Sequence, residues 1–228
     1  MSNDLFEKIK KPATVYETGG FRPEKNLGES WVGRVSFCKP GETLPLDKDG
    51  REMSPLVMFF TETAPYVPEE IKAFKMISVY ISYHSFFDHL VDCDFDGYFE
   101  VREYTDLSEL VPCEHINEHT KAFPLKAQLV EDYPQWDSED YLPMHLLEQF
   151  IEWENEEGED YFEHVEFYPY HKLGGYPYFC QSGHSYAGSK YVFQVASDYK
   201  AEMNFIDSGN LHFYRKENGE YEIYIDFY

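Results

Sequence analysis

The sequence predicts an α+β fold, mainly antiparallel β with a few helices, built as two related halves packed into one compact domain. Phe, Trp and Tyr make up 18% of the 228 residues, and aromatic side chains favour strands because they fit a pleated, half-buried surface. Residues 98–104 and 123–129 alternate between apolar and polar side chains, the period of a strand with one face in water. Helical spacing is clear over one long segment, residues 139–157.

The two-halves prediction rests on a weak internal repeat. An apolar strand, a short polar or helical segment and a second apolar strand occur at 55–82 and again at 191–215. The chain length suits one large domain. We therefore expect a single domain over 1–228 with an internal duplication, about 20–110 and 120–228.

In the first half, the segments before residue 83 are assigned from composition and turn residues. Residues 1–30 are expected to be a loosely structured arm, and 31–38 a strand. The apolar runs 55–60 and 76–82 predict buried strands. Residues 68–74 predict a short helix, because Pro is favoured in the first helical turn and acidic residues suit its positive end.

In the second half, residues 139–157 are the clearest helix. Leu142, Leu146, Phe150 and Trp153 recur at helical spacing. Ser138 or Asp140 is expected to cap the start of this helix, and Gly158 is expected to end it.

The block 171–215 is the most informative stretch. Gly174-Gly175 followed by Pro177 predicts a tight turn, because glycine allows a positive φ and proline fixes its own. Gln194 lies inside an apolar strand, where a buried amide needs hydrogen-bond partners. Residues 207–209 predict a hairpin turn. Turn chemistry explains these glycines, and a catalytic loop is the alternative.

The same block carries a family resemblance. The sequence HKLGGYP at 171–177, with 193–195 and 207–209, resembles the C-terminal signature of the YwqG-like family, a bacterial family of unknown function. Further matching stretches occur at 18–23, 30–33 with 40–42, 55–61, and 123–134. The resemblance spans nearly the whole chain but rests on turns and strand ends, so it implies a fold and no established reaction.

The formal net charge is −24, which disfavours binding to nucleic acid or to anionic membranes, since both are polyanions. A basic protein is the expected partner; the oligomeric state stays open. The first residues lack a signal-peptide pattern, and no apolar run approaches the roughly 20 residues that span a bilayer. The four cysteines form no C-x-x-C pair. A cytoplasmic protein with reduced thiols is expected.

Acidic residues are concentrated after the middle of the chain, and no Lys or Arg occurs between Lys126 and Lys172. This region is either a solvated helix face or a patch for a basic partner. The candidate patch residues are Glu148, Glu152, Glu156 and Glu157.

Two short patterns suggest metal sites. Asp92, Asp94 and Asp96, followed by Gly97 and Glu103, match the D-x-D-x-D-G-x5-E calcium loop, although an Asp-Gly turn with solvated acids also explains them. This segment is a candidate Ca²⁺ site, and no other cofactor is expected.

A second pattern places Cys113, His115 and His119 within seven residues. In a helix the two histidines would share a face, a spacing used by zinc sites. The interval is not H-E-x-x-H and no second cluster follows, so a polar surface turn is the alternative.

The sequence contains no G-x-S-x-G, phosphate-binding loop or dinucleotide fingerprint. We therefore expect a non-enzymatic binding or interaction module with an acidic surface, one form of which is an inhibitor or immunity-type protein for a basic partner. The alternative is a small-molecule-binding or metal-dependent enzyme with its site between the two halves. The candidate cleft residues for that site are His171, Gln194, Asp207, His212 and Trp31.

Overall fold

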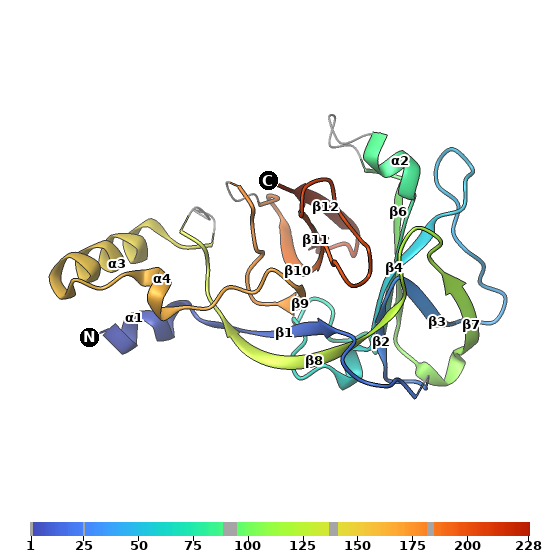
Figure 1. Cartoon of the computed structure of the whole chain (residues 1–228), viewed down its shortest axis with the longest axis horizontal. Coiled ribbons are helices and arrows are strands. Elements are labelled where there is room, and N and C mark those ends of the chain that lie inside the picture. The colour runs from blue at the N-terminus through green and yellow to red at the C-terminus, as the bar shows by residue number, and fades with distance from the viewer. Residues whose placement is uncertain (1, 25, 89–94, 137–140, 182–184) are drawn as a thin grey trace.

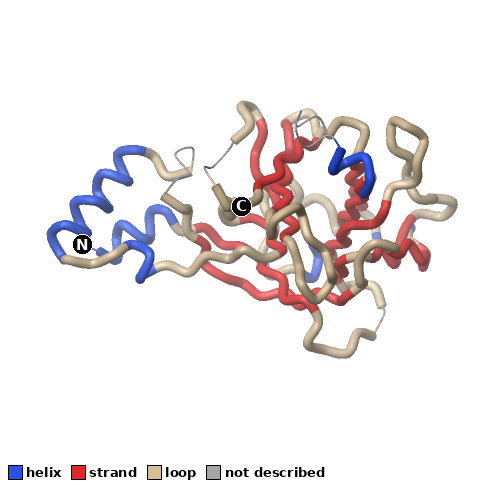
Figure 2. The backbone as a smooth tube through the Cα atoms, turned by 45° about the horizontal axis from the view of Figure 1, so that its top comes forward, coloured by secondary structure: helices blue, strands red, loops and turns tan. Residues whose placement is uncertain are grey.

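The computed structural model describes residues 2–24, 26–88, 95–136, 141–181 and 185–228. The protein is β-dominated, with 38% of residues in strands and 16% in helices, and its main sheet of ten strands is nearly closed and barrel-like (Figure 1). The predicted α+β class is therefore wrong. The reason is that the helices lie at the periphery, mostly at one end of the molecule, and do not form a layer over the sheet (Figure 2).

The strands are β1 (Lys11–Thr18), β2 (Ser30–Val32), β3 (Arg34–Cys38), β4 (Ser54–Phe59), β5 (Met76–Ile81), β6 (Phe99–Tyr104), β7 (Val111–Ile116), β8 (Phe123–Asp132), β9 (His171–Gly174), β10 (Ser189–Ala196), β11 (Asn210–Lys216) and β12 (Tyr221–Asp226). The helices are α1 (Ser2–Ile9), α2 (Tyr83–Asp88), α3 (Met144–Glu157) and α4 (Tyr161–His164), with 3-10 turns η1 (Thr61–Thr63) and η2 (Leu107–Glu109).

The main sheet has the order β12-β11-β10-β9-β1-β8-β2-β4-β5-β6, and its neighbouring strands pair antiparallel. One run of four strands, β2-β4-β5-β6, and another, β9-β10-β11-β12, flank the central pair β1–β8. The internal duplication stays a prediction. Strands β3 and β7 form a separate two-stranded sheet.

The centre of the sheet comes from residues expected to be a loose arm. Strand β1 pairs with β8 along its whole length and with β9 over four residues. Ala13, Thr14, Val15 and Tyr16 are all buried. Because both faces of β1 are covered, its side chains show no alternation that would mark it as a strand in the sequence. The predicted helix at 68–74 is also absent, and turns occupy most of that segment.

Side chains bring the two ends of the sheet together. Glu103 on β6 accepts hydrogen bonds from Arg215 on β11 at 3.0 Å and from Tyr221 on β12 at 2.5 Å. The rings of Phe99 and Phe213 lie 6.4 Å apart at the same junction. Side-chain contacts therefore join the two edges of the nearly closed sheet, and Phe99 and Phe213 pack in the largest apolar cluster.

Helices α1, α3 and α4 form a small lobe with its own apolar cluster, which includes Ile9, Leu142, Phe150, Trp153 and Tyr161. Helix α3 begins at Met144, later than expected, and the proposed cap residues Ser138 and Asp140 lie outside the described residues. Gly158 ends α3 in the left-handed conformation, as predicted, and its N–H bonds to the carbonyl of Glu154.

Candidate functional site

A hollow of about 590 Å³ opens beside β1 and β9. We call it the His171 hollow. It is lined by Val15, Tyr16, Glu17, Thr18, Gln128, Val130, Glu166, Tyr168, Tyr170, His171, Ala196, Ser197, Asp198, Tyr199 and Lys200. Four separate segments meet there because β1 lies between β8 and β9 in the sheet, while the β9–β10 pairing brings the end of β10 alongside.

His171 stands at the start of β9, opposite Tyr16 on β1, and its side chain is buried. Its Nδ1 accepts the N–H of Ala196 at 3.1 Å, so the ring proton resides on Nε2. Nε2 lies 3.3 Å from Oδ2 of Asp198. Both ring nitrogens are thus engaged within the protein, which leaves neither free to take a proton from a ligand.

Asp198 joins three segments of the chain. Its Oδ2 also accepts a short hydrogen bond from the Thr18 hydroxyl, and its Oδ1 accepts the N–H of Ala201 at 3.0 Å. Burial alone would raise the pKa of Asp198, but the hydrogen bonds from His171 and Thr18 outweigh it and hold the pKa well below its usual range. Asp198 is therefore ionised at neutral pH, and its carboxylate ties β1, β9 and the connection after β10 together.

Three tyrosines and two carboxylates line the outer part of the His171 hollow. Tyr170 and Tyr199 are 54% and 99% exposed. Tyr168 donates a 3.0 Å hydrogen bond to Glu166, and burial together with that bond raises its pKa to about 12. Glu17 and Glu166 are both exposed. Aromatic faces beside carboxylates are an environment that attracts cations.

Lys200 is the one Lys or Arg among the described residues that line the hollow. Its ammonium group donates a 2.8 Å hydrogen bond to the carbonyl of Thr18. Residues 197–200 also border a second, wider hollow of about 910 Å³, which extends toward Lys121 and Glu202. The two hollows therefore share one wall, the connection between β10 and β11.

A buried polar row lies across neighbouring strands, formed by Lys172, Gln194 and His212 in register. Lys172 pairs with Asp132 at 2.7 Å. Gln194 accepts the N–H of Tyr178 at 2.9 Å. Burial lowers the pKa of both Lys172 and His212, the latter to about 3. His212 is therefore neutral, and the row stabilises the segment that follows the Gly174-Gly175 turn.

The structure brings some predicted cleft residues together and separates others. His171 lines the hollow, whereas Gln194 and His212 are opposed across β10 and β11 and bond to backbone carbonyls. Asp207 is exposed in the β10–β11 connection. Trp31 is buried on β2 in a different apolar cluster. These five residues therefore do not line a single cleft.

The candidate acidic patch lies on α3, far from the C-terminal strands in Figure 1. Glu148, Glu152, Glu156 and Glu157 are all exposed. The first three are spaced four residues apart, which places them along one side of the helix. Within the described part of the chain, these four carboxylates have no ion-pair partner.

The predicted calcium loop is only partly visible. Asp92 and Asp94 lie outside the described residues, and Asp96 is exposed in the turn before β6. Glu103 forms an ion pair with Arg215 and also accepts a hydrogen bond from Tyr221. A calcium ion at Glu103 would have to replace those contacts, and the calcium site stays a prediction.

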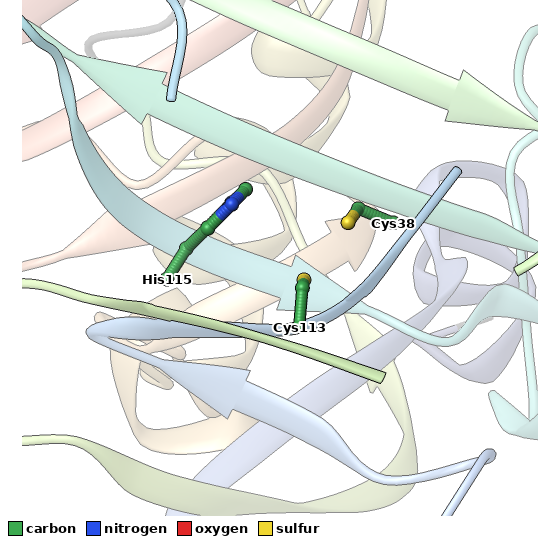
Figure 3. Close-up of side chains that lie close together, drawn as sticks. All are labelled: Cys38, Cys113 and His115. Carbon is green, nitrogen blue, oxygen red and sulfur yellow. The ribbon is translucent and has the colours of Figure 1, made fainter. Parts of the chain in front are cut away.

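The described residues contain one group of three side chains suited to a metal ion: Cys38, Cys113 and His115 (Figure 3). The sequence pattern proposed Cys113, His115 and His119 on a helix, but residues 111–116 form strand β7. His119 instead stacks on Tyr83, with ring centroids 4.1 Å apart.

Comparison with known families assigns the chain to one of them. The model of a domain of unknown function, DUF1963, matches residues 30–218. The chain belongs to the DUF1963 family. That match supports the resemblance at the level of a family of unknown function, while the YwqG-like name stays a prediction. The DUF1963 match runs from β2 to the turn after β11, so α1, β1 and β12 complete the fold from outside it.

No curated protein matches the chain. Among the described residues, no helix is long and apolar enough to cross a bilayer.

Sequence reasoning missed Asp198 and the role of Thr18, the residues that hold His171 in place. Thr18 begins one of the stretches that carry the family resemblance, and Asp132 lies in another. A signal for Asp198 existed, because an Asp just beyond the end of an apolar strand commonly bonds the backbone of the following turn. Its contact with Thr18, 180 residues away, has no local signal.

Proposed function

We propose that this protein is a non-enzymatic binding module for a basic partner, and that the His171 hollow receives a cationic side chain of that partner. The observation that carries the proposal is the composition of the outer hollow. Tyr168, Tyr170 and Tyr199 line the hollow together with the carboxylates of Glu17 and Glu166. A lysine or arginine side chain meets both attractions there, because cations bind aromatic faces and carboxylates.

The net charge of −24 supports the same direction, since a strongly acidic protein attracts basic partners over long range at low salt. The exposed glutamates of α3 supply a second acidic surface. We propose that they steer the partner, whereas the hollow provides the specific contact. An inhibitor or immunity-type protein that neutralises a basic toxin or nuclease is one form of this function.

An enzyme has weaker support. The buried polar groups of the hollow are not free to act as an acid or base, because both nitrogens of His171 are engaged and Asp198 accepts three hydrogen bonds. Lys200 is bonded to a backbone carbonyl. These groups therefore act as positioning residues that shape the hollow.

We also propose that the protein works in the cytoplasm. The cysteines that the structure describes, Cys38, Cys113 and Cys180, are free thiols. Free thiols suit a reducing compartment.

The test measures binding of a labelled oligolysine peptide and an oligoarginine peptide at low and high salt. We expect the double variant Glu17→Gln/Glu166→Gln and the variant Tyr199→Ala each to bind the peptides at least tenfold more weakly than the wild type does. Glu217→Gln, which removes one exposed charge in the β11–β12 turn, is the control for loss of a surface charge and should bind normally.

A triple variant, Glu148→Gln/Glu152→Gln/Glu156→Gln, separates the two acidic surfaces. We expect it to reduce the association rate and its salt dependence with little change in the dissociation rate, because steering acts on encounter. If the hollow variants bind both peptides as the wild type does, the proposed site is wrong.

A further inference from the structure

Three potential metal ligands meet in the small β3–β7 sheet, away from the residues that line the His171 hollow. Cys38 ends β3, and Cys113 and His115 lie two residues apart on β7. Cys113 and His115 are both half-buried, whereas Glu114 between them is exposed, so the two side chains share the inner face of the strand. The two sulfur atoms and one imidazole nitrogen all lie within 4.8 Å of one another, and Figure 3 shows the three side chains converging.

The surroundings hold these side chains in place. Cys38 is buried, and the other two are half-buried. The Tyr80 hydroxyl lies 3.0 Å from Nδ1 of His115. Among the described residues no hydrogen bond to Nε2 occurs. A metal on Nε2 would leave Nδ1 with its Tyr80 partner, the arrangement usual for metal-binding histidines.

We propose that Cys38, Cys113 and His115 bind a thiophilic d10 metal ion, with Zn²⁺ as the ion the site takes. Two thiolates and an imidazole are the ligand types that Zn²⁺ prefers. Three protein ligands leave a fourth coordination position for water or another donor. The proposal is independent of the His171 hollow, because the two sites share no residue.

Protonation in the metal-free protein opposes metal binding and makes the affinity depend on pH. Burial, followed by the neighbouring Cys38 thiol, raises the pKa of Cys113 to about 12. Burial and the nearby Arg102 cation lower the pKa of His115, which keeps the imidazole neutral. Metal binding must therefore expel thiol protons, and the affinity should rise with pH. Glu42 is a further charged group close to the side chains of Cys113 and His115.

The thiols have only weak partners to give up. Cys113 points at the carbonyl of Val35 at 3.6 Å, and Cys38 points at the carbonyl of Glu42 at 3.9 Å. Sulfur is a weak hydrogen-bond donor. A Zn–S bond replaces these contacts with a much stronger one.

The test uses tag-free, fully reduced protein titrated first with Co²⁺, which gives a thiolate charge-transfer absorption only when bound to cysteine sulfur. We expect one equivalent of Co²⁺ to bind with that absorption, and Zn²⁺ to displace it. Cys38→Ser, Cys113→Ser and His115→Asn should each weaken Zn²⁺ binding at least tenfold. Circular dichroism shows whether each variant folds, and the wild-type cobalt spectrum tests the site if one does not.

Two matched controls sharpen the result. Cys180→Ser removes a described thiol outside the cluster, and His119→Asn removes the histidine of the alternative helical pattern. Both should bind Zn²⁺ like the wild type. The proposal is overturned if reduced wild-type protein shows no charge-transfer absorption, or if the absorption survives in the Cys38→Ser/Cys113→Ser double variant. Loss of Zn²⁺ binding in His119→Asn would also overturn this ligand set.

Discussion

The ammonium group of Lys172 lies 2.7 Å from Oδ2 of Asp132, and this ion pair links β9 to β8 across the intervening strand β1. The two side chains are 1% and 2% exposed. Asp132 also accepts the N–H of Tyr176, the residue that follows the Gly174-Gly175 turn. One carboxylate therefore fixes both the central strands and the chain that leaves them.

Removing one member of this ion pair should lower the free energy of unfolding far more than removing both members. Lys172→Met leaves a buried carboxylate without its counter-charge, which destabilises proteins by about 3–5 kcal/mol. The double variant Lys172→Met/Asp132→Leu should recover a substantial part of that loss. Urea unfolding of the two single variants and the double variant measures the coupling. Additive effects would contradict this account.

Gly175 should not tolerate a side chain. Its φ is +67°, and an added Cβ would collide with the Asp132 carboxylate and lie 2.9 Å from the Cβ of Ala13. Gly188 is the matched control, because its φ is +83° and nothing lies within 4 Å of an added Cβ. We expect Gly188→Ala to cost about 1–2 kcal/mol from backbone strain alone. Gly175→Ala should cost clearly more, measured by urea unfolding, and equal costs would refute the predicted collision.

Glu103 should stabilise the junction of the sheet edges. Glu103→Gln weakens the ion pair with Arg215 and the hydrogen bond from Tyr221, and hydrogen bonds to charged groups contribute about 1.5–3 kcal/mol. Melting temperature with and without Ca²⁺ separates this role from calcium binding. Glu103→Gln should lower the melting temperature by the same amount with and without Ca²⁺. A decrease seen only with Ca²⁺ would favour the calcium loop.

Acidification should destabilise the protein through His212. Its pKa is about 3 in the folded protein, against 6.5 when unperturbed. Below pH 6.5 the unfolded chain binds a proton that the folded chain does not, so stability falls as pH falls toward 3. The slope approaches about 1.4 kcal/mol per pH unit.

The variant His212→Gln keeps a donor for the carbonyl of Tyr178 but cannot titrate. Its unfolding free energy, measured in urea from pH 7.5 to 4.5, should depend less on pH than that of the wild type. His145→Gln changes an exposed imidazole on α3 and serves as the control. A slope unchanged by His212→Gln would contradict the prediction.

Local patterns predicted the elements whose signals are local. Residues 76–82 and 98–104 form strands almost where expected, and Gly158 ends α3. The patterns failed for β1, whose two faces are both buried, and for residues 68–74, where turns replace a helix. The patterns also predicted too large a contribution of helices to the fold. Periodicity shows that a helix exists, but it does not show how much of the core that helix covers.

The candidate sites also combine residues that have a local sequence signal with residues that only the fold brings together. His171 and Gln194 stand out in the sequence, but Asp198 and Thr18 are recognised only when the fold brings them to His171. The Cys38 thiol joins Cys113 and His115 only because β3 pairs with β7. A ligand set built from two strands has no fixed spacing along the chain.

The sequence by itself determined an acidic composition with a charge of −24, a strand-rich chain, glycine-dependent turns and one amphipathic helix. Only the tertiary structure decided that the strands form one barrel-like sheet and which side chains share a site. The physical reason is the range of the interactions. Turns, caps and periodicity act within a few residues, whereas strand pairing and buried ion pairs join residues far apart in the chain.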